Sequence, residues 1–527
     1  MAGTIDAKAL RDAFDDGAEL AVIDVREEGV FGRSHLLRAV NIPLSVLELR
    51  IRDLVPRAAI RLVVIDDEDG LSQRACKILT AAGYNDLSIL QGGVQGWSQA
   101  GFELFSGMNV PSKVFGEHIE HRYDTPNISA EDLKARVDAG ENLVILDSRP
   151  MNEFHRMSIP GGIDSPGAEL VRHVRDLAPD PDTLVVVNCA GRTRSIIGAQ
   201  SLINAGTPNR VMALKNGTMG WHLAGLALEH GADRQYGDVS QTALDWSLDA
   251  AAQVARKYGV QSIEADTLRE WQGQSKERTL FVFDVRSPEE YEIGHVAGSR
   301  HAPGGQLVQA TDRYVGTANA RIVLIDDTGV RATMTASWLI QMGWTDVYIL
   351  KDGLTHLPCE AGAFISPVPE VTALTVPSLS VDELDPDSMT VIDLGTSLAY
   401  RDGHIPGAWW AIRSRLVDAL TRMPESRRIV VTGSDMRLVQ LGAADLASLT
   451  DAEVLVLEGG TDAWRAAGKP MEEGFTSLAA DKEDIYYLPY DREGTVEEAM
   501  NQYLTWEIAL IEQIKRDGTL VFPEFGP

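Results

Sequence analysis

Residues 184–195 read Leu-Val-Val-Val-Asn-Cys-Ala-Gly-Arg-Thr-Arg-Ser, an apolar run followed at once by a short loop that carries one cysteine and two arginines. The run has the length and the β-branched composition of a buried strand. Apolar residues at helical spacing follow at 196–205, so the stretch predicts a strand, a tight loop and a helix. In α/β sheets, ligands bind beyond the carboxyl ends of the strands, where a helix N-terminus directs free N–H groups at the site. Cys189, which leaves this strand, is therefore the first candidate for chemistry.

The same arrangement occurs four times along the chain. An apolar strand that ends in aspartate opens each copy, a second apolar strand follows it, and a Gly-rich turn closes the copy. The first strands end at Asp24, Asp147, Asp284 and Asp393, and the second strands span 61–65, 184–188, 321–325 and 428–432. Short apolar runs that alternate with helical patterns are typical of strand-helix-strand units around a buried parallel sheet. The predicted fold class is α/β, with four tandem domains that each hold a small parallel sheet flanked by helices.

Interruptions of the repeat set the expected domain boundaries. The expected domains are residues 1–107, 122–230, 255–365 and 372–475, and a C-terminal tail spans 476–527. The stretches near 104–127, 229–262 and 360–378 carry Pro, Gly or mixed polar residues, which is typical of linkers, although 248–258 has helical spacing and predicts a connecting helix. In the tail, residues 496–515 place apolar side chains on one face, so we expect a helix docked on the body of the protein.

Composition excludes several classes of function. The 527 residues include 48 Lys and Arg against 77 Asp and Glu, a net charge of −29, whereas nucleic-acid binding needs clustered basic residues. No signal-peptide pattern opens the chain and no run of about 18 apolar residues occurs, so we expect a cytoplasmic protein without a membrane partner. With only 3 Cys, neither a disulfide framework nor a Cys-based zinc site is expected.

The order of these motifs resembles the rhodanese-homology family. The chain looks like four tandem rhodanese-like domains, of which the second is equipped for catalysis. The resemblance covers roughly residues 4–470 and rests on the Asp-Ser-Arg at 147–149, the Cys-to-Arg loop at 189–194, and the Gly-Gly and Gly-Trp pairs that close the copies. It implies that Cys189 holds a persulfide at the base of the loop, and that no metal or organic cofactor is required.

The residue types of the loop suit that role. A thiol at a helix N-terminus with Arg192 and Arg194 beside it is expected to be a thiolate at neutral pH. Arg194 is expected to receive the anionic end of a donor such as thiosulfate, with Arg192 as the weaker candidate, because a guanidinium presents several donors in one plane. Successive backbone N–H groups are expected to curl around the outer sulfur as an anion nest. The further substrate-binding candidates are Ala190, Gly191, which permits the bend, and Thr193 and Ser195, which are expected to cap the helix.

Two residues at the end of the first strand of copy two are secondary candidates. Asp147 and Arg149 are expected to form a pair that fixes the turn, and as a second expectation they line the substrate pocket.

The position of Cys189 is occupied differently in the other copies. The spacing to the glycine that ends the following helix places Asp66 there in copy one and Asp326 in copy three. A carboxylate cannot accept a sulfane sulfur, so copies one, three and four are expected to be inactive, with Gly433 near this position in the fourth. The other cysteines, Cys76 and Cys359, are expected to be buried apolar side chains.

The resemblance implies a sulfurtransferase that works by two displacements. The Cys189 thiolate attacks the outer sulfur of a sulfane donor, releasing sulfite when the donor is thiosulfate, and the persulfide then passes its sulfur to a thiol or cyanide acceptor. One alternative is a persulfide carrier or scaffold that delivers sulfur to a partner protein. Another is an oxyanion phosphatase or arsenate reductase, which the loop disfavours because the Cys-x4-Arg spacing resembles that of sulfurtransferases, whereas those enzymes use Cys-x5-Arg.

Overall fold

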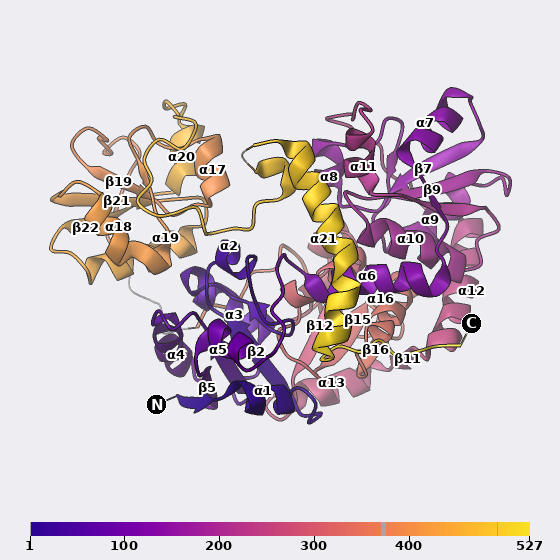
Figure 1. The fold of residues 1–527 in the computed structure, drawn as a ribbon, viewed down its shortest axis with the longest axis horizontal. Helices are drawn as coiled ribbons and strands as arrows, with labels where there is room; N and C mark the ends of the chain where they lie inside the picture. The colour runs from indigo at the N-terminus through magenta and orange to yellow at the C-terminus, as the bar shows by residue number, and fades with distance from the viewer. Residues whose placement is uncertain (1, 370–375, 493, 527) are drawn as a thin grey trace. The chain divides into compact units, whose positions relative to one another are not determined.

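The computed structural model describes residues 2–369, 376–492 and 494–526 (Figure 1). The chain divides into two compact units. One contains Met1–Leu10, Ala21–Met108 and Ser366–Tyr487, and the other contains Arg11–Leu20, Asn109–Ile365 and Leu488–Pro527. The expected start of the fourth domain, residue 372, lies outside the described residues.

Each copy forms a five-stranded sheet with the same order of strands, so the predicted α/β class is confirmed. In copies two, three and four, all pairs of neighbouring strands run parallel. Copy two contains β6 (Asn127–Ile128), β7 (Leu143–Asp147), β8 (Ile163–Asp164), β9 (Leu184–Asn188) and β10 (Val211–Leu214), in the order β6-β10-β9-β7-β8. Its helices are α7 (Ala130–Asp138), α8 (Met151–Arg156), α9 (Leu170–Leu177), α10 (Thr193–Asn204) and α11 (Gly217–Leu223).

Copy three repeats this plan. Its sheet contains β11 (Gln261–Ile263), β12 (Leu280–Asp284), β14 (Arg300–His301), β15 (Arg321–Ile325) and β16 (Val347–Leu350). Its helices are α13 (Ala265–Gly273), α14 (Pro288–Ile293), α15 (Gly304–Gln309) and α16 (Val330–Gln341). A separate antiparallel ribbon joins β13 (His295–Val296) to β17 (Cys359–Glu360).

Copies one and four follow the same order of elements. Copy one contains β1 (Gly3–Ile5), α1 (Ala7–Ala13), β2 (Leu20–Asp24), α2 (Glu28–Phe31), β3 (Val40–Asn41), α3 (Leu47–Leu54), β4 (Arg61–Ile65), α4 (Leu71–Ala81), β5 (Leu87–Leu90) and α5 (Gly93–Gln99). Copy four contains β18 (Ser378–Leu379), β19 (Thr390–Asp393), α17 (Ser397–Asp402), β20 (Trp409–Trp410), α18 (Leu416–Arg422), β21 (Arg428–Thr432), α19 (Met436–Ala447), β22 (Glu453–Leu457) and α20 (Gly460–Ala466).

The strand β9 lies inside the copy-two sheet and is covered on both faces. Val185 and Val187 pack on one face in a cluster with α9 and α10, while Val186 packs on the other face with Leu133 and Trp221. Successive side chains of a strand point to opposite faces, so a continuous apolar run is needed where both faces are covered. The burial of β9 therefore holds its carboxyl end, and Cys189 after it, in one place.

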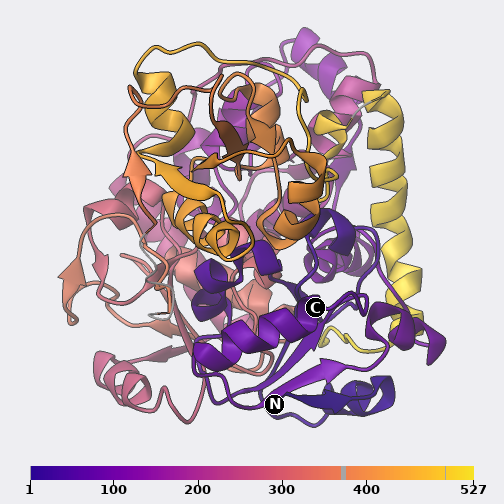
Figure 2. The ribbon, with the colours of Figure 1, turned by 90° about the vertical axis from the view of Figure 1, so that its left-hand side faces the viewer.

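Two helices lie in stretches that the sequence assigned to linkers, and a third forms the tail. The stretch 104–127 contains α6 (Val110–Tyr123), whose buried face includes Val114, Phe115 and Ile119. The linker at 229–262 contains α12 (Gln241–Tyr258), which is longer than the expected helix. The tail helix α21 (Val496–Asp517) packs against α6 and is the long yellow helix in Figures 1 and 2. Among the described residues, no helix combines the length and the apolarity that a membrane span requires.

We expect the loss of a core side chain of α10 to make local opening of the copy-two sheet easier. Leu202 is fully buried in the cluster that covers β9, so Leu202→Ala should lower the free energy of opening at β9 by about 2–5 kcal/mol. Leu248→Ala is the matched control, because Leu248 on α12 is 41% exposed and its truncation should change stability by less than about 0.5 kcal/mol. Hydrogen exchange of the β9 amides measures both, and equal effects of the two variants would contradict this account of the core.

Candidate functional site

Cys189 lies at the carboxyl edge of the copy-two sheet, between β9 and α10. The residue is 2% exposed, and its Sγ donates a hydrogen bond to Ser195 Oγ at 3.6 Å. Ser195 Oγ in turn donates to the carbonyl of Arg192 at 2.7 Å. The thiol is thus held inside the first turn of α10, which begins at Thr193 rather than at the expected Ile196.

A glycine of the closing turn holds the backbone of this loop. Gly217 has a φ of +54°, and a Cβ at this position would overlap the carbonyl oxygen of Cys189. The next residue, Thr218, donates its N–H to the same carbonyl at 2.8 Å. The corresponding close contacts join Gly93 to Asp66, Gly353 to Asp326, and Gly460 to Gly433. The structure therefore places these residues at the same position of their copies as Cys189.

Copies one and three show which backbone groups surround the side chain at this position. Asp66 accepts hydrogen bonds from the backbone N–H groups of Glu68 at 3.1 Å and Ser72 at 2.9 Å. Asp326 accepts them from Gly329 at 2.6 Å and Arg331 at 2.9 Å. Burial raises the pKa of Asp326 to about 6. In both copies the loop forms a cradle of backbone donors around an anionic group, and in copy two a sulfur atom stands at that position.

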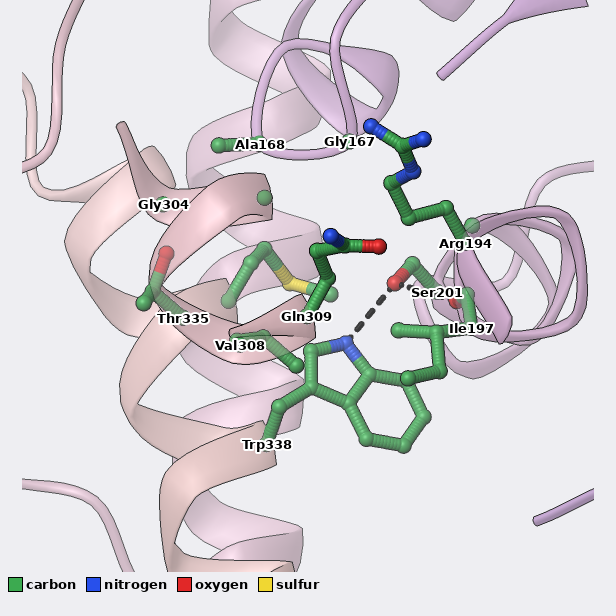
Figure 3. A pocket seen from close by; sticks show the side chains of 13 residues that line it. Gly167, Ala168, Arg194, Ile197, Ser201, Gly304, Val308, Gln309, Thr335 and Trp338 are labelled. Carbon is green, nitrogen blue, oxygen red and sulfur yellow. Dashed lines mark hydrogen bonds between the residues drawn. The ribbon is translucent and has the colours of Figure 1, made fainter. Parts of the chain in front are cut away.

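Arg194 brings a cation to the loop. Its two terminal nitrogens each donate to a carboxylate oxygen of Glu153 at 2.7 Å, and one also donates to Gln306 of copy three at 3.1 Å. Burial opposes the charge, but Glu153 and the neighbouring Cys189 raise the pKa of Arg194 above its ordinary value. Figure 3 shows Arg194 extending from α10 toward Gly167 at a small pocket between copies two and three.

The same ion pair exists in copy three, where Arg331 binds both carboxylate oxygens of Glu290 at 2.6 and 3.0 Å. The arginine-glutamate pair is therefore common to these two copies, whereas only copy two has a cysteine at the end of its second strand.

Arg192 is bound by carboxylates of α6. It donates to both oxygens of Glu117, at 2.5 and 2.8 Å, and to Glu120. Burial raises the pKa of Glu117, although the guanidinium opposes this shift. The charge of Arg192 is thus balanced by α6, and its part in donor binding stays a prediction.

The C-terminal tail covers the loop. The hydroxyl of Tyr490 lies 3.0 Å from that of Thr218, and Thr193 donates to Glu507 of α21 at 2.7 Å. The side chain of Tyr503 lies 3.4 Å from where a Cβ of Gly191 would stand. An apolar cluster completes the contact and joins Met500 and Leu504 of the tail to Met219, Ala190 and Leu223. The expected docking of the tail helix therefore takes place on the loop that carries Cys189.

Three residues that contact the loop or its surroundings are not among those expected from the sequence: Glu117, Tyr490 and Glu507. Apolar residues at helical spacing in 110–119 could have revealed α6, but no local pattern indicates that Glu117 meets Arg192 or that the tail returns to copy two.

Asp147 and Arg149 are fully buried and bind each other. Arg149 donates to both carboxylate oxygens of Asp147, at 2.9 and 2.8 Å, and to the carbonyl of Met157 at 2.6 Å. Asn188, at the end of β9, also donates to Asp147 at 2.9 Å. Through Asn188, the pair links β7 to the end of β9, at the residue that precedes Cys189. Its contact with substrate stays a prediction.

The other cysteines differ from each other. Cys76 is buried on α4, but Cys359 is exposed, so the expected burial of Cys359 is wrong. The reason is that Cys359 lies in the short ribbon strand β17, which no core covers.

Comparisons with known proteins agree with this architecture. A family model described as the Rhodanese-like domain matches residues 6–100, 129–224, 264–357 and 379–467. The crystal structure of a thiosulfate sulfurtransferase from Pseudomonas aeruginosa is 46% identical, with 99% of this chain and 100% of that chain covered and a TM-score of 0.94. The thiosulfate sulfurtransferase GlpE of Pseudomonas paraeruginosa is 33% identical over 82 residues, 15% of this chain and 71% of that protein. An HTH-type transcriptional regulator of Mycobacterium tuberculosis is 33% identical over 111 residues, and the match spans only 48% of its length.

We expect the two accessory cysteines to react differently with iodoacetamide. Burial, and to a lesser degree Asp66, raises the pKa of Cys76 to about 11, so at pH 7.5 almost no Cys76 is thiolate and the exposed Cys359 is alkylated first. Alkylation of Cys76 should then rise about tenfold per pH unit until about pH 11. Peptide mapping by mass spectrometry follows each site. Equal labelling of both cysteines at pH 7.5 would show that Cys76 is not in the environment described.

Proposed function

Since the chain belongs to the family of rhodanese-like domains, with all four copies matched, we propose that it is a sulfurtransferase in which Cys189 accepts and passes on a sulfane sulfur. The donor is thiosulfate or a related anion, and the acceptor is a thiol or cyanide. One observation carries this proposal: Cys189 stands where the loops of copies one and three surround a carboxylate with backbone N–H groups. That cradle suits an ionised sulfur. A carboxylate at the same position cannot accept a sulfane sulfur atom from a donor.

The first step forms a bond between the Cys189 sulfur and the outer sulfur of thiosulfate. The bond between the two sulfur atoms of thiosulfate breaks, and its electron pair leaves with sulfite. In the thiol form, Cys189 donates a hydrogen bond to the Ser195 hydroxyl, which in turn donates one to the Arg192 carbonyl. Once the thiol ionises, the Ser195 hydroxyl can turn and donate to the sulfur instead. In the second step, the acceptor attacks the outer sulfur of the persulfide and restores the Cys189 thiolate.

Arg194 has the position and charge to bind the anionic end of the donor. Glu153 holds its guanidinium in a bidentate pair, which fixes the direction of the side chain. Arg192, by contrast, is bound by Glu117 and Glu120, so we assign it the positioning of the loop against α6. The rest of the loop binds the transferred sulfur through its backbone N–H groups and its shape, at Ala190, Gly191 and Thr193.

The burial of Cys189 favours small reaction partners. With the tail packed on the loop, a thiol carried on another protein cannot approach the sulfur unless the tail moves. A small anion and a small thiol need a much narrower path. This observation supports turnover with small molecules over the alternative of a carrier that delivers its persulfide to a partner protein.

Cys189→Ser should abolish both half-reactions. Incubation with thiosulfate should add the mass of one sulfur atom to the wild-type chain and none to the variant, and sulfite release should fall to background. Cys76→Ser and Cys359→Ser are the matched controls, and both should retain the added mass and the turnover. Sulfite release by the Cys189→Ser variant at the wild-type rate would refute the proposed function.

Arg194→Lys should weaken the use of thiosulfate because a lysine keeps the charge but cannot make the bidentate pair with Glu153. We expect kcat/KM for thiosulfate to fall by about ten- to a hundredfold, the effect of losing a hydrogen bond to a charged group. Arg437→Lys is the control, since Arg437 is the exposed arginine near the copy-four loop. Steady-state kinetics that place both variants within twofold of the wild type would contradict the role of Arg194.

A further inference from the structure

A cavity of about 630 Å³ lies between copies two and three, both within the second compact unit. It is lined by α8 and the loop before it, the segment 164–169, the start of α14, the start of α15, and the linker residues Gln235 and Tyr236. The small pocket in Figure 3 shares Gly167, Ala168, Gly304 and Gly305 with it. Cys189 is not among the lining residues. The volume is in the range of about 300–1,000 Å³ that is usual for sites of small molecules.

One lining residue, Asp164, differs from its counterparts in the other copies. Asp164 ends β8, where it pairs in register with Asp147 of β7. The residues at the same register position are Asn41 in copy one, His301 in copy three and Trp410 in copy four. Each of these three has a side-chain nitrogen that donates to a backbone carbonyl, that of Arg26 at 2.9 Å, of Arg286 at 3.0 Å and of Gly395 at 2.8 Å. The position thus normally carries a donor that ties the strand end to the neighbouring loop.

Asp164 supplies a carboxyl group where the other copies supply a donor. The residue is 2% exposed, and its Oδ1 has no hydrogen-bond partner among the described residues. The groups that act on it electrostatically are the carboxylates of Asp147, Glu153 and Glu289 and the guanidinium of Arg149. Burial first, and these carboxylates second, raise the pKa of Asp164 to about 8. An unpartnered carboxyl group that lines a cavity is costly to the fold unless a ligand completes it.

We propose that this cavity binds small organic cations, with the ammonium group of the ligand placed against the carboxylate of Asp164. The charges of the lining favour a cation over an anion. Arg286 is occupied by Asp284, with nitrogen-oxygen distances of 2.6 to 3.1 Å, whereas Glu289 has no salt bridge among the described residues. The ring of Tyr236 packs against that of His173 in a tilted arrangement, with 4.3 Å between the ring centres. Tyr236 adds an aromatic surface to the lining, which suits an alkylammonium group.

Binding of a permanent cation should depend on pH through Asp164. The ligand pairs with the carboxylate, so binding releases the proton that Asp164 holds below about pH 8. Affinity should therefore rise as the pH is raised toward 8, by up to about tenfold per unit, and level off above it. The other titratable or charged groups of the lining are His155, Glu169, Arg286, Glu289 and Tyr236.

The test is calorimetric titration of the full chain with choline, tetramethylammonium and ethylammonium, and with 3,3-dimethylbutan-1-ol, which has the shape of choline without its charge. We expect saturable binding of at least one cation and none of the neutral alcohol. Asp164→Asn should lower the affinity for the cation at least tenfold. This variant should also fold at least as stably as the wild type, because an asparagine can donate to the Arg149 carbonyl as Asn41 donates to that of Arg26.

The matched control is Asp238→Asn, which makes the same change from a carboxyl group to an amide at an exposed residue close in sequence to Tyr236 but outside the lining. It should bind the cation as the wild type does. Three results would overturn the proposal: no binding of any of the three cations, equal binding of the neutral alcohol, or wild-type affinity in Asp164→Asn. Persulfide formation on Cys189, measured on the same samples by intact mass, tests the proposed function separately, because the titration does not depend on sulfur transfer.

Discussion

The contact between a closing glycine and the loop after the second strand is the constraint on which the site depends. In each copy the backbone of that glycine lies so close to the carbonyl at the strand end that no side chain fits there, as at Gly217 and Cys189. The contact holds the loop at the N-terminus of the following helix. With this geometry held constant, the copies differ in the residue at the strand end: a cysteine in copy two, aspartates in copies one and three, and glycine in copy four.

The copies also show which charges belong to the domain and which belong to the site. The pair of Arg194 with Glu153 recurs as Arg331 with Glu290, so it is part of the architecture and brings a cation to the loop whether or not a cysteine is present. Copy two differs from copy three in its cysteine and in the further partners of its loop arginines. Glu117 of α6 neutralises Arg192, and copy three supplies Gln306 to Arg194. A copy without a cysteine at the strand end thus contributes a side chain to the surroundings of the Cys189 loop.

Local sequence patterns predicted the sheets well and the connections poorly. The second strands at 61–65, 184–188, 321–325 and 428–432 have the predicted bounds, because a run of β-branched residues covered on both faces leaves a continuous signal. The helix after Cys189 begins three residues earlier than expected, since Thr193 to Ser195 are polar and carry no apolar periodicity. The sequence of α6 interrupts the repeat and so predicts a linker, although its apolar residues have helical spacing.

The sequence by itself determined the fold class, the number of copies and the one copy that carries sulfur at the strand end, because these follow from residues adjacent in the chain and from comparison of the copies. Only the tertiary structure decided the electrostatic partner of Arg192, the covering of the loop by the tail, and the isolation of the Asp164 carboxyl in a cavity. The physical reason is that these features are contacts between segments far apart in sequence. Periodicity reports which face of an element is buried, but not which side chain meets it there.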